Sequence, residues 1–338
     1  MKRDMNRQWR LASRPRGMVS ESNFQWVEEP IPATGDGDIL VRNLYLSCDP
    51  TQRGWMAQDT YLPAVAIGEV MRSIGVGVVE KSQHPDFALG DIISGLVGWQ
   101  DYARLNANGP ERPSKLPPGA PLPLAMSALG HTGLTAYFGL LDVGKIREGE
   151  TVVVSGAAGA TGSMACQIAK IKGCRVIGIA GGPSKCKWLV DELGVDRAID
   201  YKSEDVSTRL RELCPKGIDV YFDNVGGEIL DAALGELAMR GRVVLCGAIS
   251  GYNSDALPAG PRKYLNLLLR RGRMEGFIVF DYLGRAGEAI KDIAAWAMAG
   301  KIKDRVDVEE GLENTPKALQ RLFKGENMGK QVVKVGDL

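Results

Sequence analysis

The chain has 338 residues, of which 44% are apolar and 25% are charged, the composition of an ordinary globular protein. That length exceeds what one hydrophobic core usually serves, so we expect two domains. Lys and Arg number 42 against 41 Asp and Glu. Such a balanced charge gives no support to a general nucleic-acid or membrane-surface role, and we expect neither partner.

Signals that would direct the chain out of the cytoplasm are weak. The first 16 residues carry six basic side chains, but Asp4 interrupts them and apolar residues are too sparse for a presequence. The longest uncharged stretch, Leu116–Leu141, holds four prolines and four glycines, which argues against a membrane span. The six cysteines include no close pair and no Cys-x-x-Cys, as suits a reducing compartment. We therefore expect a cytoplasmic protein.

The first third of the chain is dense in β signals. Asp38–Ser47 predicts a strand, and Ala64–Val79 and Ile92–Val97 continue the β-rich pattern. The many glycines in these segments favour a strongly bent sheet or a small barrel. Gly109–Pro123 is a proline-rich connector, and Ala125–Leu141 predicts a helix that joins two domains.

From Thr151 onward strands and helices alternate, which predicts a parallel sheet covered on both faces. The expected strands are Val152–Ser155, Arg175–Ala180, Ala198–Asp200, Ile218–Asp223 and Arg242–Gly247. The expected helices are Thr161–Lys172, Ser184–Leu193, Ser203–Leu213, Glu228–Leu237 and Gly284–Gly300. A β-rich tail follows from Val306, with a helix at Pro316–Lys324 and a strand at Gln331–Val335, and we expect it to fold back on the first domain.

A glycine-rich turn, Gly156–Gly162, lies between the first of these strands and its helix. Its spacing puts Gly159 where backbone approaches a pyrophosphate and Gly162 where the helix meets the strand. Ala157 stands where the G-x-G-x-x-G pattern has its first glycine, so the match is imperfect. A tight turn without a ligand is the alternative. Because the turn lies inside a full β/α series, we interpret it as a dinucleotide site.

The end of the second strand bears on the choice between NADH and NADPH. NAD-preferring folds place an acid there to bind the ribose 2′-hydroxyl. Here the strand runs into Gly181–Lys185, which has no acid and ends in a lysine. Lys185 would attract the 2′-phosphate of NADPH. The alternative is that Lys185 is one more solvated charge at a helix start.

Catalytic zinc needs three converging protein ligands. The chain has two histidines and no clustered cysteines. His84 lies in a charged turn, where we expect it to be exposed. His131 either lines the active cleft or is a polar residue at a helix start. We therefore expect no metal.

Without a metal, a substrate carbonyl must be polarised by hydrogen bonds, so tyrosines become candidates. Tyr252 follows the strand Arg242–Gly247, outside the carboxyl end where ligands bind in such sheets. Tyr61 lies on a first-domain loop and could face it. Either tyrosine could instead be a packing residue. Asn224 follows the strand Ile218–Asp223, as a cofactor contact or as a turn former.

Six segments spread over the whole chain are similar to one known family. They are Asn6–Trp9, Gly133–Leu140, Ala157–Gly162, Tyr221–Gly227, Cys246–Ser250 and Lys324–Lys330. On these segments the chain resembles the zinc-independent medium-chain dehydrogenase/reductases, in the branch of leukotriene 12-hydroxydehydrogenase, prostaglandin reductase, plant alkenal double-bond reductases and bacterial curcumin reductase.

The resemblance implies an α/β fold with a bent, chaperonin-10-like β domain (1–127 plus 301–338) and a Rossmann domain with a doubly wound parallel sheet (128–300). It implies an active cleft between the domains, NADPH as cofactor and a homodimer. The implied cofactor contacts are Pro50, Gly159, Ala160, Thr161, Gly162, Lys185, Tyr201, Asn224, Cys246, Gly247, Ala248, Ile249, Ser250, Phe277, Ile278, Val279 and Asn327.

Two positions bear on how far the resemblance extends. Zinc-binding members of the superfamily carry a Cys near Cys48 and a Gly-His-Glu near Gly68, but this chain has Ile67-Gly68-Glu69 without a histidine. The branch often has Asp-Pro-Tyr-x-Arg-Gly, whereas this chain has Thr51 in place of the tyrosine. That departure bears on the substrate.

The leading hypothesis is NADPH-dependent reduction of the C=C bond of an α,β-unsaturated ketone or aldehyde. Tyr252 would be the catalytic residue that hydrogen-bonds the carbonyl or enolate oxygen, and it or water would supply the α-proton. Tyr61 and Tyr252 would contact the substrate. A zinc-free NADPH quinone reductase is one alternative. A non-catalytic NADPH-binding structural or sensor protein is another.

Overall fold

The computed structural model describes residues 5–254, 256 and 259–338. The chain forms two compact units, the first up to residue 126 together with 306–338, and the second over 127–305. No helix of the described residues is long and apolar enough to cross a membrane.

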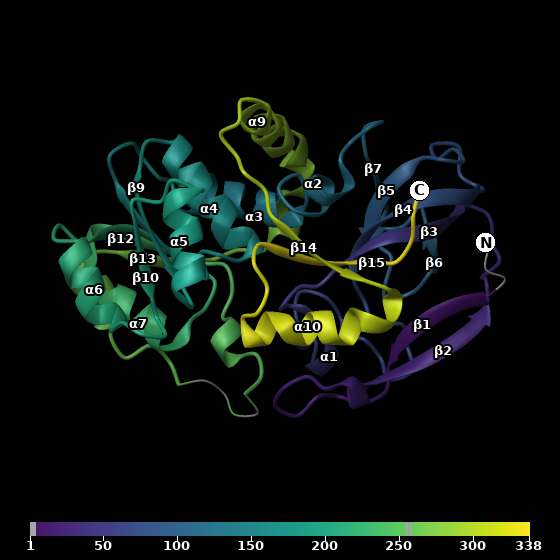
Figure 1. The fold of residues 1–338 in the computed structure, drawn as a ribbon, viewed down its shortest axis with the longest axis horizontal. Helices are drawn as coiled ribbons and strands as arrows, with labels where there is room; N and C mark the ends of the chain where they lie inside the picture. Colours follow the sequence, from purple (N-terminus) through teal and green to yellow (C-terminus); the bar gives the residue numbers. More distant parts are fainter. Residues whose placement is uncertain (1–4, 255, 257–258) are drawn as a thin grey trace. The chain divides into compact units, whose positions relative to one another are not determined.

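The first unit contains a two-stranded sheet and a seven-stranded sheet (Figure 1). The small sheet pairs β1 (Met5–Leu11) with β2 (Phe24–Pro30). The larger sheet has the order β14-β15-β3-β4-β5-β7, with β6 also paired to β3. Its strands are β3 (Asp38–Ser47), β4 (Ile74–Ser82), β5 (Ile92–Leu96), β6 (Tyr102–Asn106), β7 (Ser114–Lys115), β14 (Val306–Glu310) and β15 (Lys330–Lys334). The helices are α1 (Gln52–Ala57), α2 (Leu122–Met126) and α10 (Thr315–Lys324).

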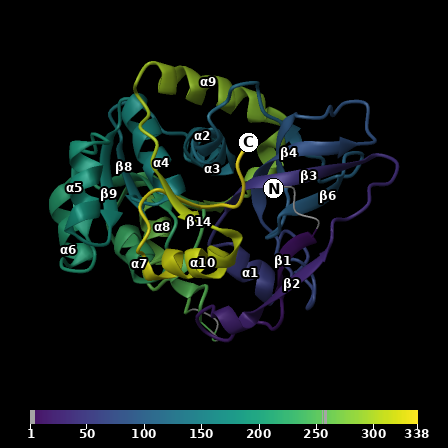
Figure 2. The same ribbon diagram turned by 45° about the vertical axis from the view of Figure 1, so that its right-hand side comes forward.

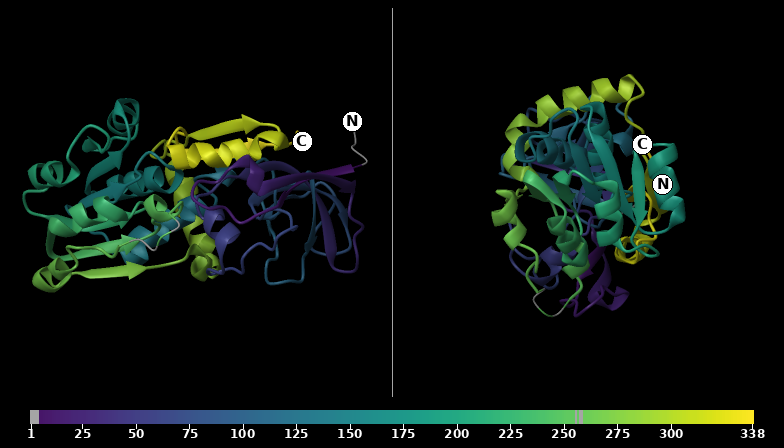
Figure 3. Two further views of the ribbon diagram at one scale, coloured as in Figure 1. Left: turned by 90° about the horizontal axis from the view of Figure 1, so that it is seen from below. Right: turned by 90° about the vertical axis from the view of Figure 1, so that its left-hand side faces the viewer.

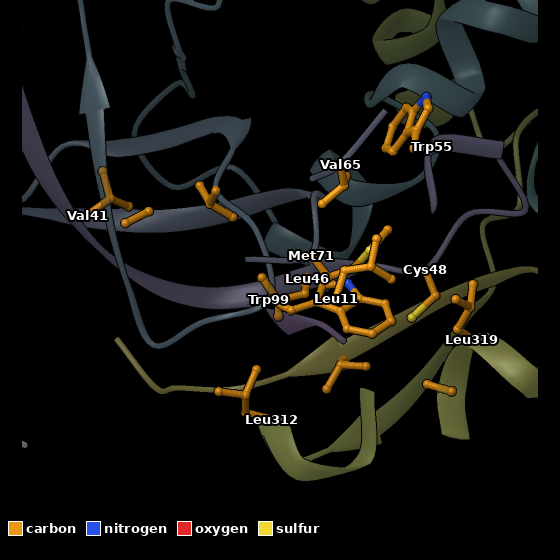
Figure 4. Packing of buried hydrophobic residues seen from close by; sticks show 14 of the residues in the cluster. Leu11, Val41, Leu46, Cys48, Trp55, Val65, Met71, Trp99, Leu312 and Leu319 are labelled. Carbon is orange, nitrogen blue, oxygen red and sulfur yellow. The ribbon is translucent and has the colours of Figure 1, made fainter. Parts of the chain in front are cut away.

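The tail belongs to this first unit, as the sequence predicts. β15 pairs antiparallel with β3, and its Val333 faces Leu46. Helix α10 packs along β15, as the left view of Figure 3 shows. The unit's core contains Leu11, Trp55, Trp99, Leu319 and other buried apolar side chains (Figure 4).

Glycines in β4 allow the close strand approach that the β-rich pattern indicates. A Cβ on Gly75 would lie 2.6 Å from the carbonyl oxygen of Tyr45, and one on Gly77 would lie 2.6 Å from that of Arg42. The register between β3 and β4 shifts near the same residues, between Asn43 and Tyr45. Such shifts bend a sheet.

The second unit is a parallel six-stranded sheet in the order β10-β9-β8-β11-β12-β13. Its strands are β8 (Thr151–Ser155), β9 (Arg175–Ala180), β10 (Arg197–Asp200), β11 (Ile218–Asp223), β12 (Leu237–Leu245) and β13 (Arg273–Gly276). Its helices are α3 (His131–Phe138), α4 (Ala160–Ile171), α5 (Pro183–Asp191), α6 (Val206–Leu213), α7 (Gly227–Gly235), α8 (Leu265–Arg270) and α9 (Ala286–Met298). Figure 2 shows α4 and α5 beside β8 and β9. This strand order is that of the Rossmann fold, so the predicted fold class is confirmed.

Both faces of this sheet are buried, which explains the continuous apolar strands. Neighbouring side chains of a strand point to opposite faces. One set joins the core that includes Leu210 of α6 and Leu230 of α7, and it contains Val153, Ile177, Ile179, Tyr221 and Val243. The alternate set is fully buried as well, and it contains Val152, Val154, Val176, Val220 and Val244.

The single helix expected over Ala125–Leu141 is wrong. The structure has α2, a break at residues 127–130, and then α3, which continues into a wider turn at Gly139–Val143. In the break, the hydroxyl of Thr132 donates to the carbonyl of Ser127 at 2.9 Å. The hydroxyl of Ser127 itself donates to the carboxylate of Asp304. One local bond and one tertiary bond thus replace helical bonds at this break.

The two ends of the second unit are thereby held together. Besides the Ser127–Asp304 bond, the side chain of Gln167 on α4 donates to the carbonyl of Lys303 at 3.0 Å and accepts its N–H at 2.7 Å. The first residue of the unit and its last few residues are therefore neighbours.

The expectation that His84 is exposed is also wrong. Only 8% of His84 is exposed. Its Nε2 lies 3.0 Å from Oδ1 of Asn108, and its Nδ1 accepts the N–H of Asp86 at 3.1 Å. Both ring nitrogens of His84 are thus hydrogen-bonded within the first unit, which is why the ring is buried under the charged turn. His131 begins α3, as one of its two interpretations predicts.

Candidate functional site

The glycine-rich turn follows β8 at the carboxyl edge of the parallel sheet. Gly156 has φ +57°, a conformation that favours glycine. A Cβ on Gly162 would lie 2.2 Å from the carbonyl oxygen of Gly156, so the predicted close contact of helix and strand is confirmed. Ala157 is buried, and a Cβ on Gly178 of β9 would lie 3.0 Å from its methyl group. The glycine in β9 makes room for the alanine that departs from the motif.

Three helices begin at this edge without a side-chain cap. Helices α4, α5 and α7 follow Gly159, Gly182 and Gly226, and none of these N-cap residues has a side chain that could accept a backbone N–H. The first N–H groups of a helix have no acceptor inside it, and the N-terminus carries a partial positive charge. Anionic groups such as phosphates fit such an edge.

The strand order reverses between β8 and β11, and ligands of open parallel sheets bind at that point. The predicted contact Asn224 lies there. Its side-chain amide donates to the carbonyl of Ser155 at 2.7 Å. A Cβ on Gly156 would lie 3.3 Å from the Cβ of Asn224, so the side chain stands directly beside the glycine turn.

The residues proposed for a 2′-phosphate also lie near one another. A Cβ on Gly181 would lie 2.9 Å from the ring and hydroxyl of Tyr201, which is 46% exposed. Lys185 is in the first turn of α5, two residues after Pro183. The Tyr201 hydroxyl thus lies against Gly181, and Lys185 follows the same turn in the sequence.

The sequence reasoning missed Asp200, the last residue of β10. Its carboxylate accepts the N–H of Gly182 at 2.7 Å, the N–H of Lys202 at 3.0 Å and the hydroxyl of Ser203 at 3.0 Å. The Gly182 bond, with the other two, holds the pKa of Asp200 below its usual value. The turn after β9 has no acid of its own, but the neighbouring strand supplies one that shapes it.

Tyr252 follows β12 and a short helical turn at Ile249–Gly251, outside the carboxyl end of the strand, as predicted. Its hydroxyl oxygen accepts the N–H of Ala248 at 3.1 Å. The predicted contacts from Cys246 to Ser250 form the same loop. The predicted segment Phe277–Val279 follows β13. The ring of Phe277 packs edge-on against that of Tyr282, with 6.2 Å between the ring centroids.

Three predicted site residues lie in the first unit, each described within that unit. Pro50 precedes α1 and accepts the N–H of Arg53 at 3.1 Å. Tyr61 is 42% exposed, and its hydroxyl lies 2.8 Å from that of Thr51. Asn327 is buried, and its side-chain amide donates to the carbonyl of Gly329 at 3.0 Å.

A second missed feature is a buried ion pair beside Pro50. Lys330, 1% exposed, donates to the carboxylate of Asp49 at 2.7 Å and to the carbonyl of Cys48 at 2.9 Å. Burial raises the pKa of the Cys48 thiol to about 12. The thiol is therefore protonated at neutral pH.

No group of three His, Cys, Asp or Glu side chains in the part of the chain that the structure describes could hold a metal ion. The residues that could hold a cofactor are instead those of the sheet edge. A parallel sheet in Rossmann order, with a glycine turn and three uncapped helix starts at its carboxyl edge, defines a dinucleotide-binding α/β protein.

Comparisons with known proteins agree with that class. A family model described as the N-terminal domain of oxidoreductase matches residues 7–112, and one described as zinc-binding dehydrogenase matches residues 160–295. The chain belongs to the medium-chain dehydrogenase/reductase family, in the zinc-independent branch that its sequence resembles.

Three relatives illustrate the similarity. The NADPH-dependent curcumin reductase of Escherichia coli (strain K12) is 41% identical over 98% of this chain and 97% of that protein. The 2-alkenal reductase (NADP(+)-dependent) of Nicotiana tabacum is 41% identical over 89% of this chain and 88% of that protein. The crystal structure of CurA from Vibrio vulnificus in complex with NADPH is 44% identical, with a TM-score of 0.93 over 98% of this chain and 100% of that one.

Proposed function

We propose that this chain is an NADPH-dependent reductase of the C=C bond of α,β-unsaturated ketones and aldehydes. The observation that carries the proposal is the meeting of the glycine turn, Asn224 and the Tyr252 loop at the switch point of the parallel sheet. The relatives that are similar over nearly the whole chain include an NADPH-dependent curcumin reductase and an NADP(+)-dependent 2-alkenal reductase.

The residues that would hold NADPH are those of the sheet edge. The N–H groups at the start of α4, after Gly159, fit the pyrophosphate, while Lys185 and Tyr201 fit the 2′-phosphate. When bound, NADPH supplies the hydride that reduces the β-carbon of the conjugated C=C bond. We propose the remaining predicted contacts, including Pro50 and Asn327, on the family resemblance.

Tyr252 is the side chain that we propose to act on the substrate. Reduction at the β-carbon leaves an enolate, whose oxygen carries more negative charge than the carbonyl oxygen of the substrate. A hydroxyl donor placed at that oxygen stabilises the transition state more than the ground state. The Ala248 N–H that binds the Tyr252 oxygen orients the hydroxyl, which still carries its own hydrogen as a donor.

The test is a screen of NADPH oxidation with the purified protein over enals, enones and quinones, followed by Tyr252→Phe at saturating enone. We expect turnover of enals and enones with NADPH, and a loss of about 10²-fold in kcat for the variant. Binding of NADPH without turnover of any compound would contradict the proposed reaction. Higher kcat/KM for quinones than for enones would assign the chain to quinone reduction.

We also propose a cytoplasmic homodimer, formed through the free edge of the parallel sheet. β13 ends the strand order, and the segment before it exposes leucines, with Leu268 73% and Leu269 63% exposed. If two copies of β13 paired antiparallel about Met274, Arg273 of each copy would face Glu275 of the other. The strand is therefore complementary in charge to itself, as an isologous interface requires. The six free cysteines suit the cytoplasm.

A further inference from the structure

Asp223, the last residue of β11, is a buried carboxyl group that the proposed reaction does not use. It is 1% exposed, and its Oδ1 accepts four bonds. The donors are the hydroxyls of Ser155 and Tyr221, both at 2.9 Å, and the N–H groups of Val225 at 3.0 Å and Gly226 at 2.9 Å. One carboxylate oxygen thus binds two strands and the turn that follows β11.

Stability alone does not account for this carboxylate. Burying a polar group is costly, and a well-packed apolar residue often serves stability better. The second oxygen, Oδ2, is buried and has no hydrogen-bond partner within the described part of the chain. The four bonds that Oδ1 makes are therefore what indicates the role of this side chain.

One set of bonds leads from Asp223 to the glycine turn. The Ser155 hydroxyl that donates to Asp223 accepts the N–H of Asn224 at 2.9 Å. Asn224 in turn donates its side-chain amide to the carbonyl of Ser155. The carboxylate therefore holds the last residue of β8, directly before Gly156, in register with the turn after β11.

A second set leads from Asp223 to the loop that carries Tyr252. The carbonyl of Val225, whose N–H binds Asp223, accepts the N–H of Ser250 at 3.1 Å and the Ser250 hydroxyl at 2.6 Å. The backbone carbonyl of Asp223 accepts the N–H groups of Cys246 and Gly247 at 2.9 and 3.0 Å. The loop is therefore hydrogen-bonded to the end of β11 and the turn after it at two places, at Cys246–Gly247 and at Ser250.

A small displacement of this loop would also move the Tyr252 hydroxyl. That hydroxyl accepts the N–H of Ala248, two residues before Ser250. A Cβ on Gly247 would lie 3.2 Å from the Tyr252 hydroxyl, so the oxygen lies against the backbone of the loop. A shift of the backbone at 247–250 therefore moves the reacting hydroxyl.

We infer that Asp223 and Ser250 are positioning residues that act through Tyr252. They hold the loop so that the Tyr252 hydroxyl stays at one place relative to the glycine turn. The inference rests on the proposed function for the role of Tyr252, but the position of the loop can be measured without the reaction.

The kinetic test is a double-mutant cycle on the full-length protein with an enone and saturating NADPH, because Ser250 is also one of the proposed cofactor contacts. We expect Ser250→Ala to lower kcat about fivefold and Asp223→Asn at least tenfold, with enone KM changing less than twofold. In a Tyr252→Phe background each change should alter kcat less than twofold. Ser250→Thr keeps the hydroxyl and should restore the rate. Ser254→Ala is the matched control, because the Ser254 hydroxyl donates to the carbonyl of Ala256 and accepts its N–H within the same loop. Equal losses with Tyr252 and with Phe at that position would overturn the inference.

The second readout is amide hydrogen exchange of the peptide spanning residues 246–254, without substrate. Ser250→Ala and Asp223→Asn should speed exchange at 248–252 about fivefold or more, and Ser254→Ala should not. Unchanged exchange in both variants would overturn the inference even if the reductase is active. If the wild-type protein reduced no unsaturated carbonyl but exchange rose as expected, the proposed function would fail and the positioning of the loop would stand.

Discussion

The hydroxyl of Thr51 lies 2.8 Å from the hydroxyl of Tyr61. Thr51 stands at the position where the branch that the sequence resembles often has a tyrosine. Trp55 packs edge-on against the Tyr61 ring, with 6.2 Å between the ring centroids. Burial raises the pKa of Tyr61 above its ordinary value, and the Thr51 bond opposes that rise. Thr51 is thus the residue that differs from the family pattern. Its hydroxyl orients Tyr61, which we propose as a substrate contact.

Replacing Thr51 by Val removes the hydroxyl and keeps the shape of the side chain. We expect the enone KM to rise about threefold to tenfold, because Tyr61 loses a bond of about 1 kcal/mol that holds its hydroxyl. The NADPH KM should stay the same. Steady-state kinetics with Thr51→Ser as the control, which retains the hydroxyl, check this. Equal enone KM values for Thr51→Val and the wild type would remove Thr51 from substrate recognition.

Lys185→Ala should weaken NADPH binding about 10-fold to 100-fold, because a charge-assisted bond to the 2′-phosphate contributes about 1.5–3 kcal/mol. NADH binding should not change, since NADH has no phosphate there. Titration of each nucleotide by fluorescence gives both Kd values. Lys187→Ala is the matched control, because Lys187 lies on the same helix and pairs with Asp191. A parallel loss of NADPH affinity in the control would contradict a specific role for Lys185.

Asp200 should make the stability of the protein depend on pH. Its folded pKa is lowered, so its charge stabilises the fold above the unfolded pKa of about 4, and that contribution is lost as the pH falls through the folded value. Thermal unfolding of wild type and Asp200→Asn between pH 3 and 7 measures the effect. We expect the wild type to have the higher Tm at pH 7 and the difference to shrink below about pH 4. A difference that is independent of pH would show that the charge is not responsible.

Lys330→Met should destabilise the first unit by about 3–5 kcal/mol, because it leaves the carboxylate of Asp49 buried without its partner. Unfolding in urea measures the loss, and Lys330→Met combined with Asp49→Asn should recover part of it. Lys334→Met is the control. Its ion pair with Asp337 is on the surface, where such pairs contribute little to stability. Similar losses in both lysine variants would contradict the interpretation of a buried pair.

Glu275→Arg should weaken the proposed dimer, because two positive side chains would then meet across the paired β13 strands. Light scattering after gel filtration should show a shift toward the monomer at low micromolar concentration and low salt. Glu192→Arg makes the same change of charge at the residue that follows α5, at the far side of the strand order, and should leave the mass unchanged. A wild-type protein that is already monomeric would contradict the proposal.

Four strands of the parallel sheet, β8 to β11, could be predicted from the sequence to within one residue at each end, whereas β12 begins at Leu237, before the predicted Arg242. Arg175–Ala180 and Ile218–Asp223 are strands with the predicted bounds, because both faces of the sheet are buried and their apolar runs end at glycine or polar residues. β13 was not predicted. Its Arg273 and Glu275 are exposed at the sheet edge, so this strand lacks an apolar run.

Site residues that directly follow a strand in the sequence could be predicted. Site residues that reach their place through contacts with distant parts of the chain could not. Gly162 and Asn224 follow strands and lie where the motif predicts. The carboxylate of Asp200 reaches a turn 18 residues earlier in the chain, and Lys330 pairs with a residue 281 positions away. No local pattern encodes such contacts. The break before α3 was missed for the same reason, because its bond partner is Asp304.

That last bond has a consequence for how the protein can be taken apart. Because Ser127 and Asp304 are joined by a hydrogen bond, the chain enters and leaves the second unit at one point. The nucleotide-binding half is thus an insertion with adjacent ends, of the kind that tolerates excision, circular permutation and transplantation. Residues 127–305 can be produced alone, with a short linker that joins the two ends in a circular permutant. This protein can be tested for NADPH binding in the absence of the rest of the chain.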